Sequence, residues 1–212
     1  MWSVLAPFAL TALLLAMVPG QGTAMLLRQA MTGGVRSVLL SALGTCAGLL
    51  IWASASAIGL SAIFVASPLA YNALRWAGAL YLAFLSIQTL IELRKRRPHF
   101  TVDSQGGRAG FLAFRLGLTT NLLNVKAAVF SVAFIPQFVP HGFPIVRGIL
   151  TLGLVQAAVS FLWAAFLGTS ISRATEMLAS ERARKILTLV SAIGFLILSL
   201  SLLIARQGLT SS

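Results

Sequence analysis

The densest group of polar residues inside a long apolar stretch is Thr119, Thr120, Asn121, Asn124 and Lys126. A lysine at the centre of a membrane-spanning helix costs about 3 kcal/mol on insertion scales, so it needs a partner or a route to the interface. An ammonium in a low-dielectric cavity binds an anionic group well, because the two charges offset each other's burial cost. The pattern predicts that Lys126 binds a carboxylate, with Asn121 and Asn124 as hydrogen-bond donors. Snorkelling of Lys126 to an interface is the open alternative.

This site requires an irregular helix. Asn121 and Asn124 are three residues apart and share one helical face. At 100° per residue, however, Lys126 would point about 160° away from Asn124 on a regular helix. In that case it would face another helix or the cytoplasmic interface.

A second candidate position is Pro19-Gly20, followed by Gln21, deep in the first apolar stretch. Proline removes a backbone donor and clashes with the preceding turn, and glycine loosens the helix further. In transporters a bound substrate or ion often satisfies backbone groups freed in this way. A packing kink without a ligand is the alternative interpretation.

The positions of the acidic residues are an objection to a standard proton-coupled carrier. The four acidic residues are Glu92, Asp103, Glu176 and Glu181, and none lies in the middle of an apolar stretch. A proton-coupled carrier often uses a buried carboxylate. Only Glu92 comes near such a position, and its favoured role is that of a solvated partner of the neighbouring arginines.

The cysteine and histidines do not suggest metal or covalent chemistry. Cys46 is the single cysteine, and His99 and His141 fall between apolar stretches with no HExxH motif. We therefore expect no metal, no cofactor and no catalytic residues, and a membrane-embedded enzyme is poorly supported.

The composition indicates an integral membrane protein. Of 212 residues, 58% are hydrophobic and 9% charged, whereas a soluble domain averages about 25% charged residues. The net charge of +12 comes from short basic clusters between apolar stretches, which is typical of cytoplasmic loops. The expected partner is the lipid bilayer and not a nucleic acid.

The charged residues separate six apolar segments, each long enough to span a bilayer as a helix. They are Trp2 to Leu27, Ser37 to about Val65, about Tyr71 to Ile91, about Leu116 to Val139, the 25 uncharged residues between Arg147 and Arg173, and the 20 between Lys185 and Arg206. The sequence predicts an all-α fold in a single transmembrane domain over residues 1–212.

Basic residues set the expected orientation. The loops after the first, third and fifth segments carry Arg28, Arg36, Arg94, Lys95, Arg96, Arg97, Arg108, Arg115, Arg173, Arg182, Arg184 and Lys185, whereas the opposite side has only Arg75, Arg147 and Arg206. Because cytoplasmic loops are enriched in Lys and Arg, both termini are predicted to be periplasmic.

The chain divides into halves 1–97 and 110–212, joined by a cytoplasmic linker 98–109. Three spans per half give the halves opposite orientations, as in the inverted repeats of secondary transporters. Residues 18–21 correspond roughly to residues 123–126, and Gly44 and Trp52 loosely to Gly153 and Trp163.

Gly44 and Gly48 form a GxxxG pattern in the second segment, with Ser41 one turn earlier. Small residues at this spacing allow helices to approach closely. Packing within one chain is favoured over a dimer seam, although the sequence leaves a homodimer open.

Taken together, the motifs resemble those of the LysE/RhtB amino-acid exporters. The similar stretches are 17–22, 33–36 with Gly44 and Gly48, 74–82, 121–128 and 136–139, which follow in the family's order along nearly the whole chain. Three positions, in two motifs, depart from that pattern. Gln21 and Gly22 stand where the family has its second proline and often an acid, and Val125 replaces the proline of Asn-Pro-Lys.

The resemblance implies six spans in the bacterial inner membrane and efflux of amino acids or related metabolites, generally driven by proton exchange. It implies a substrate path lined by Pro19, Gly20, Gln21, Asn121, Asn124 and Lys126. Val125 gives less reason than a proline to expect a broken fourth helix, and the missing acid puts the usual coupling and charge preference in doubt. A passive channel for a small polar solute is the alternative function.

The topology can be tested directly. A periplasm-active reporter fused after Ser212 should be active, because the basic loops hold the odd-numbered connections in the cytoplasm. A reporter fused within residues 98–109 should be active only if it requires the cytoplasm. Cytoplasmic activity after Ser212 would contradict both the topology and the inverted repeat.

Overall fold

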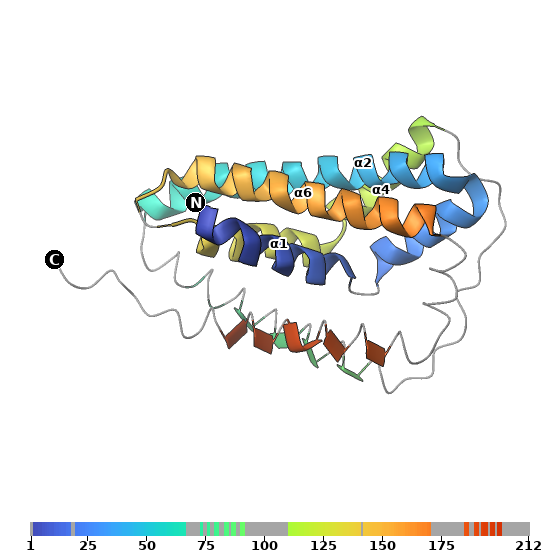
Figure 1. Ribbon diagram of the computed structural model, residues 1–212. Coiled ribbons are helices and arrows are strands. Elements are labelled where there is room, and N and C mark those ends of the chain that lie inside the picture. The colour runs from blue at the N-terminus through green and yellow to red at the C-terminus, as the bar shows by residue number, and fades with distance from the viewer. Residues whose placement is uncertain are drawn as a thin grey trace.

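The computed structural model describes residues 2–17, 20–66, 110–140 and 142–170, with scattered positions of 73–91 and 185–200. Every regular element among them is helical (Figure 1), which confirms the all-α prediction. The elements are α1 (Trp2–Met17), α2 (Gln21–Ala66), α4 (Phe111–Leu122), α5 (Val125–Val129), the π-helix η1 (Phe130–Phe134), the 3-10 helix η2 (Ile135–Phe138) and α6 (Ile145–Thr169).

The first predicted segment, Trp2 to Leu27, is not one helix. It contains α1, which ends at Met17, and the first turns of α2, which begins at Gln21. The break coincides with the Pro19-Gly20 position, as expected from the loss of a backbone donor. Pro19 itself lies outside the described residues.

A glycine turn divides α2 into two antiparallel parts. Gly34 has φ 65° and ψ −169°, a conformation that side chains with a Cβ rarely adopt. Figure 1 shows the chain reversing direction there. Buried Ser37 donates a hydrogen bond from its hydroxyl to Gln29 across the turn. Residues 35–66 therefore match the second predicted segment.

The long part of α2 packs between α4 and α6. Gly44 faces the backbone of Phe114 and Leu118, and Gly48 faces the side chain of Asn121, so these helices run parallel. The Ser41 hydroxyl adds a 3.0 Å hydrogen bond to the carbonyl oxygen of Ala113. Both glycines of the GxxxG pattern are thus used within the chain, which confirms the intramolecular interpretation.

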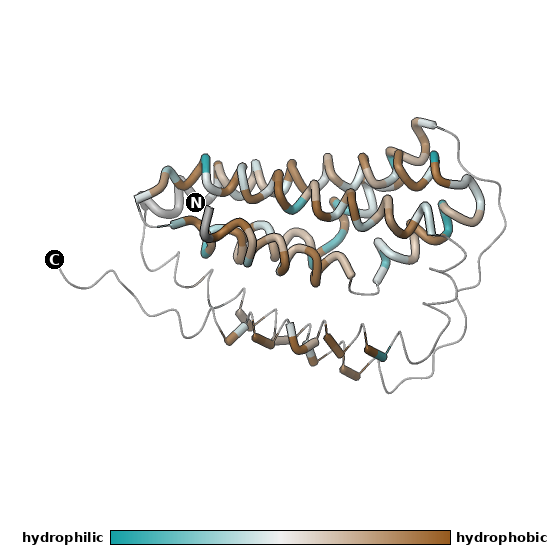
Figure 2. Tube along the Cα trace, in the orientation of Figure 1, coloured by the Kyte–Doolittle hydropathy of each residue, from teal (hydrophilic) through white to brown (hydrophobic). Residues whose placement is uncertain are grey.

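On its other side α2 meets α6 in antiparallel fashion. Gly168 contacts Val38 near one end of the pair, and Gly153 contacts Ala53 further along. The outer face of α6 is a stripe of exposed apolar side chains at intervals of four or eight residues: Leu150, Leu154, Leu162 and Phe166. Figure 2 shows hydrophobic residues along the length of these helices. Such a surface fits lipid and not water.

Within the described residues, Gln21–Gly59 and Ile145–Thr169 are long and apolar enough to cross a membrane. Phe111–Leu122 and Val125–Phe138 add a third span if this bent pair is counted as one. The described positions of 73–91 and 185–200 are helical, as the third and sixth predicted segments require.

These last two segments lie side by side. The Ser86 hydroxyl donates to the carbonyl oxygen of Ala192 at 2.8 Å, and the Ser199 hydroxyl donates to that of Ala79 at 2.9 Å. The residue pairing shows that the two segments run antiparallel. The complete six-span arrangement in two inverted halves stays a prediction.

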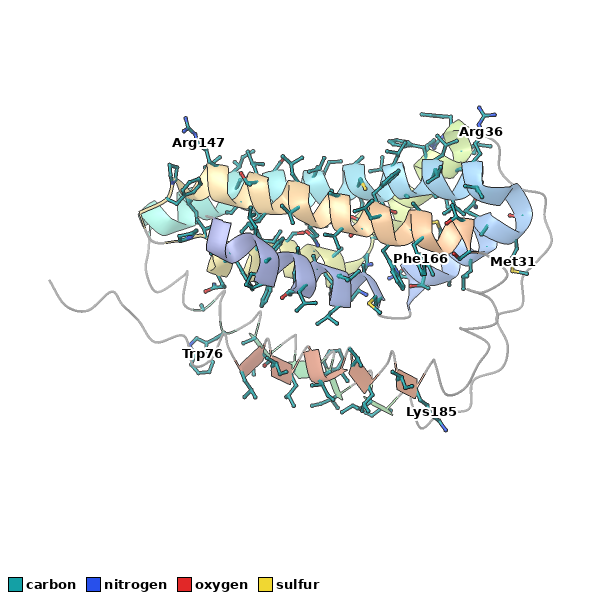
Figure 3. The ribbon with its side chains drawn as sticks, in the orientation of Figure 1. Met31, Arg36, Trp76, Arg147, Phe166 and Lys185 are labelled. Atoms are coloured by element: carbon teal, nitrogen blue, oxygen red, sulfur yellow. The ribbon has the colours of Figure 1, made fainter. Side chains whose placement is uncertain are left out.

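The basic residues separate along the length of the bundle. Figure 3 shows Arg36 and Lys185 at one end, and Arg147 and Trp76 at the other. The first two residues belong to loops predicted to be cytoplasmic, and Arg147 belongs to the opposite side. These three charges therefore lie at opposite ends of the described bundle, and which end faces the cytoplasm stays a prediction.

Close packing of α4 on α2 yields a stability prediction. A Cβ on Gly117 would collide with the backbone carbonyl of Ser41, which cannot move without separating the helices. Gly117→Ala should destabilise the protein by about 1–3 kcal/mol, the usual cost of overpacking. Thermal unfolding of the detergent-solubilised protein measures the effect. Gly59→Ala is the matched control, because nothing lies within 4 Å of that position; equal melting temperatures for both variants would refute the packing argument.

Candidate functional site

The fourth predicted span is broken near its middle. It begins at Phe111, earlier than the expected Leu116, and α4 ends at Leu122 after 12 residues, or about 18 Å. Asn124 is extended, with ψ 98°, and the chain resumes as α5 in a direction bent by 62°. Replacement of the family's proline by Val125 gave less reason to expect this break, yet the break is present.

The side chain of Asn124 caps the helix that follows the break. Its Oδ1 accepts a 3.1 Å hydrogen bond from the backbone N–H of Lys126, so Asn124 is the N-cap of α5. The backbone N–H of Asn124 donates to the carbonyl oxygen of Asn121 at 3.0 Å and closes α4. These two hydrogen bonds pair backbone N–H groups at the break, as the interior of a bilayer demands.

The break also redirects Lys126. The objection that Lys126 would point away from Asn124 applies to a regular helix, and the helix is not regular between the two residues. The half-buried Lys126 extends its Nζ to the carbonyl oxygen of Leu15, at 3.3 Å. Leu15 belongs to the last turn of α1, where carbonyls lack intrahelical partners. A cation there also complements the negative end of the helix dipole.

Lys126 thus connects two of the helix breaks in the described residues, the one after α1 and the one in the fourth span. The exposed Gly20 follows the end of α1, and its carbonyl oxygen accepts the backbone N–H of Ala24 at 2.9 Å, so Gly20 begins the next helix. Gln21 is also exposed. Of the residues predicted to line the path, the fold brings Lys126 to the end of α1, immediately before the Pro19-Gly20 position.

Asn121 has different surroundings from Asn124. Its side chain is 6% exposed and lies against Gly48 of α2, where any larger residue would displace it. Its Oδ1 is buried without a hydrogen-bond partner. The two asparagines therefore differ in kind, because Asn124 caps a helix whereas Asn121 presents an unused acceptor inside the bundle.

Other buried polar atoms without partners were not anticipated from the sequence. They are Trp52 Nε1, Ser56 Oγ, Ser131 Oγ, Gln156 Oε1 and Trp163 Nε1. One sequence signal was available for Gln156, which is the only carboxamide among the 25 uncharged residues between Arg147 and Arg173. Serine and tryptophan are common in membrane helices and carry no comparable signal.

An aromatic cluster adjoins this region. Phe8 of α1 packs edge-on to Phe138 at 5.3 Å between ring centroids, and Phe134 lies between Phe130 and Phe138 at 4.8 and 5.0 Å. The bent fourth span is therefore held against α1 by apolar contacts as well as by Lys126. The break sits in a packed bundle and not in a loop.

These features define a class of protein. Apolar helices that break inside the bundle are a recurring feature of secondary transporters. The sequence matches the LysE type translocators over residues 13–206, and the chain belongs to this family of membrane proteins.

Three relatives illustrate the similarity. The homoserine/homoserine lactone efflux protein of Salmonella typhimurium is 32% identical over 156 residues, which cover 73% of this chain and 74% of that protein. The leucine efflux protein of an Enterobacter species is 26% identical over 178 residues, or 82% of each chain. An uncharacterized membrane protein of Bacillus subtilis is 23% identical over 203 residues, or 91% and 94% of the two chains. No solved structure matches this chain.

The capping role of Asn124 can be tested by substitution. Asn124→Ala should lower the free energy of unfolding by about 0.5–2 kcal/mol, because the N–H of Lys126 loses its acceptor. Asn124→Ser keeps an oxygen at the cap and should retain most of the stability. Thermal unfolding in detergent compares the variants, and a serine variant as unstable as the alanine variant would count against capping.

Proposed function

We propose that this chain is a secondary transporter that exports neutral amino acids, or related zwitterionic metabolites, across the bacterial inner membrane. The observation that carries this proposal is the contact between Lys126 and the end of α1, which joins the two helix breaks. A helix break frees backbone groups, and a cation beside it can receive the carboxylate of a substrate. The efflux functions named for the relatives support export as the direction of transport.

In this proposal Lys126 exchanges partners during transport. In the structure its ammonium is held by a neutral carbonyl oxygen, that of Leu15. A carboxylate is a stronger partner for an ammonium than a carbonyl oxygen, because two opposite charges attract each other strongly in a low-dielectric interior. Asn121 donates a further hydrogen bond from its amide group. Asn124 contributes the helix cap that positions Lys126 and can donate from its own amide.

The expected substrate carries no second positive charge. The acidic residues Glu92, Asp103, Glu176 and Glu181 all lie outside the described residues and outside the middle of every predicted span. A dicationic substrate such as lysine would bring an unpaired charge into an apolar bundle, at a high cost. Homoserine and leucine, named for two relatives, are zwitterions without a side-chain charge.

The proposed architecture has six spans in two inverted halves, with both termini periplasmic. Three facts support it. Residues 35–66 and α6 pair in antiparallel fashion, as do the described positions of 73–91 and 185–200, and both the first and fourth segments break near their middle. A two-fold axis in the membrane plane would relate the halves in this way.

Coupling to protons is part of the proposal, and a passive channel for a small polar solute is its rival. An exchanger should respond to an imposed pH gradient, whereas flux through a channel for a neutral zwitterion should not. In proteoliposomes, an inwardly directed proton gradient should accelerate amino-acid release through the exchanger.

The substrate prediction can be tested in cells that overproduce the protein. Threonine, homoserine or leucine should accumulate in the medium in preference to lysine. Lys126→Met, which keeps the length of the side chain without its charge, should abolish this export, and Lys126→Arg should retain part of it. Preferential export of lysine, or normal export by both Lys126 variants, would overturn the assigned substrate class or the assigned role of Lys126 respectively.

A further inference from the structure

Arginines and exposed apolar side chains share one end of the described bundle, where α2 turns at Gly34 and α4 begins. The two helices run parallel, and Gly117 of α4 lies against Ser41 of α2. Gly34 and Phe111 precede these contact residues by about two turns each, so they lie at the same end. The exposed surface there, the α2–α4 end, consists of Met31, Val35, Arg36, Phe111, Leu112 and Arg115.

On α4, a cation lies over an exposed aromatic ring. Phe111 is 71% exposed and is the first residue of the helix. The guanidinium of Arg115, one turn further along, lies 6.0 Å from the centroid of that ring. The side chain of Arg115 therefore extends back toward the end of the bundle, as long basic side chains do when they reach for a membrane interface. This places a charge next to apolar surface at the beginning of α4.

On α2, the turn repeats this combination. Arg36 is exposed, and so are Val35 and Met31, of which Met31 is 53% exposed. Figure 3 shows Arg36 and Met31 at the same end of the bundle. Large apolar side chains are unfavourable in water, and arginines are unfavourable among acyl chains. A surface that exposes both fits the boundary between the head groups and the acyl chains of a bilayer.

The charge of this surface selects the kind of head group. Among the described residues, the α2–α4 end carries two arginines and no acid. The loops predicted on this side carry 12 basic residues against the four acids of the whole chain. A guanidinium matches the oxygens of a phosphate with two parallel hydrogen bonds. In a zwitterionic lipid the cation of the head group offsets the phosphate, whereas an anionic lipid presents a net negative charge to these arginines.

We propose that the α2–α4 end binds anionic phospholipids of the bilayer. Arg36 and Arg115 hold the phosphate groups, and Met31, Phe111 and Leu112 lie among the first carbons of the acyl chains. These apolar side chains distinguish a lipid from a free phosphate ion, which would leave them in contact with water. The inference names a partner surface and does not depend on the proposed export of amino acids.

The test measures thermal unfolding of the full chain in mixed micelles with increasing phosphatidylglycerol, which is anionic, or phosphatidylcholine, which is zwitterionic. A lipid that binds the folded protein raises the melting temperature. Phosphatidylglycerol should raise it more than phosphatidylcholine does at equal mole fraction, and the difference should shrink at high salt because salt screens exposed charges. Inorganic phosphate alone should produce no comparable shift.

The variant that removes both cations is Arg36→Gln with Arg115→Gln. It should need about tenfold or more phosphatidylglycerol to reach the same shift, because each basic residue near an anionic surface contributes to binding. Its melting temperature without added lipid should match that of the wild type, since both side chains are exposed. Arg147→Gln is the matched control, because Arg147 is an exposed arginine at the opposite end of the bundle. It should respond to phosphatidylglycerol as the wild type does.

Four outcomes would overturn the inference. They are equal shifts with phosphatidylglycerol and phosphatidylcholine, a double variant with the lipid response of the wild type, an Arg147→Gln variant as weak as the double variant, and an equal shift with inorganic phosphate. The comparison of the two lipids and its salt dependence use the wild type alone, so they decide the question even if a variant fails to fold.

Discussion

The structure depends on one constraint, which is that a bilayer offers no water to hydrogen-bond a broken helix. The chain nevertheless ends α1 at Met17 and α4 at Leu122, inside its bundle. Each break must therefore be satisfied by the protein itself. Asn124 caps the helix that follows the second break, and Lys126 reaches the last turn of α1 at the first. The two irregular positions thus support each other.

Tight helix contacts make this arrangement possible. Gly44, Gly48 and Gly117 have no side chains at the contact between α2 and α4. The backbones of the two helices therefore approach each other closely, and the side chain of Asn121 lies directly against Gly48. In lipid, where the hydrophobic effect does not drive helices together, such packing and interhelical hydrogen bonds are the main sources of association. The seam holds α4 firmly against α2 up to the point at which the fourth span bends away. Because α4 is held rigidly on α2, the part of the fourth span after the break keeps a fixed direction, and so does Lys126.

The polar interior combines paired and unpaired groups. Ser41 and Ser86 donate to carbonyl oxygens across helix seams, whereas the hydroxyls of Ser56 and Ser131 and the amide oxygens of Asn121 and Gln156 have no partner. A transporter must accept some cost of this kind, because a site that satisfies itself has no affinity left for a substrate.

The sequence by itself determined that the chain lies in a bilayer, the class of protein, and the approximate bounds of two spans, residues 35–66 and α6. Uncharged stretches long enough to cross a bilayer can only be helices there, and the order of motifs identified the family. It also marked Pro19-Gly20 as a break and Lys126 as an unusual charge. Only the tertiary structure decided that the fourth helix breaks without a proline, that Lys126 meets α1, and that Gln156 is buried unpaired. The contact of Lys126 with α1, for example, joins residues 111 positions apart, which local sequence patterns do not encode.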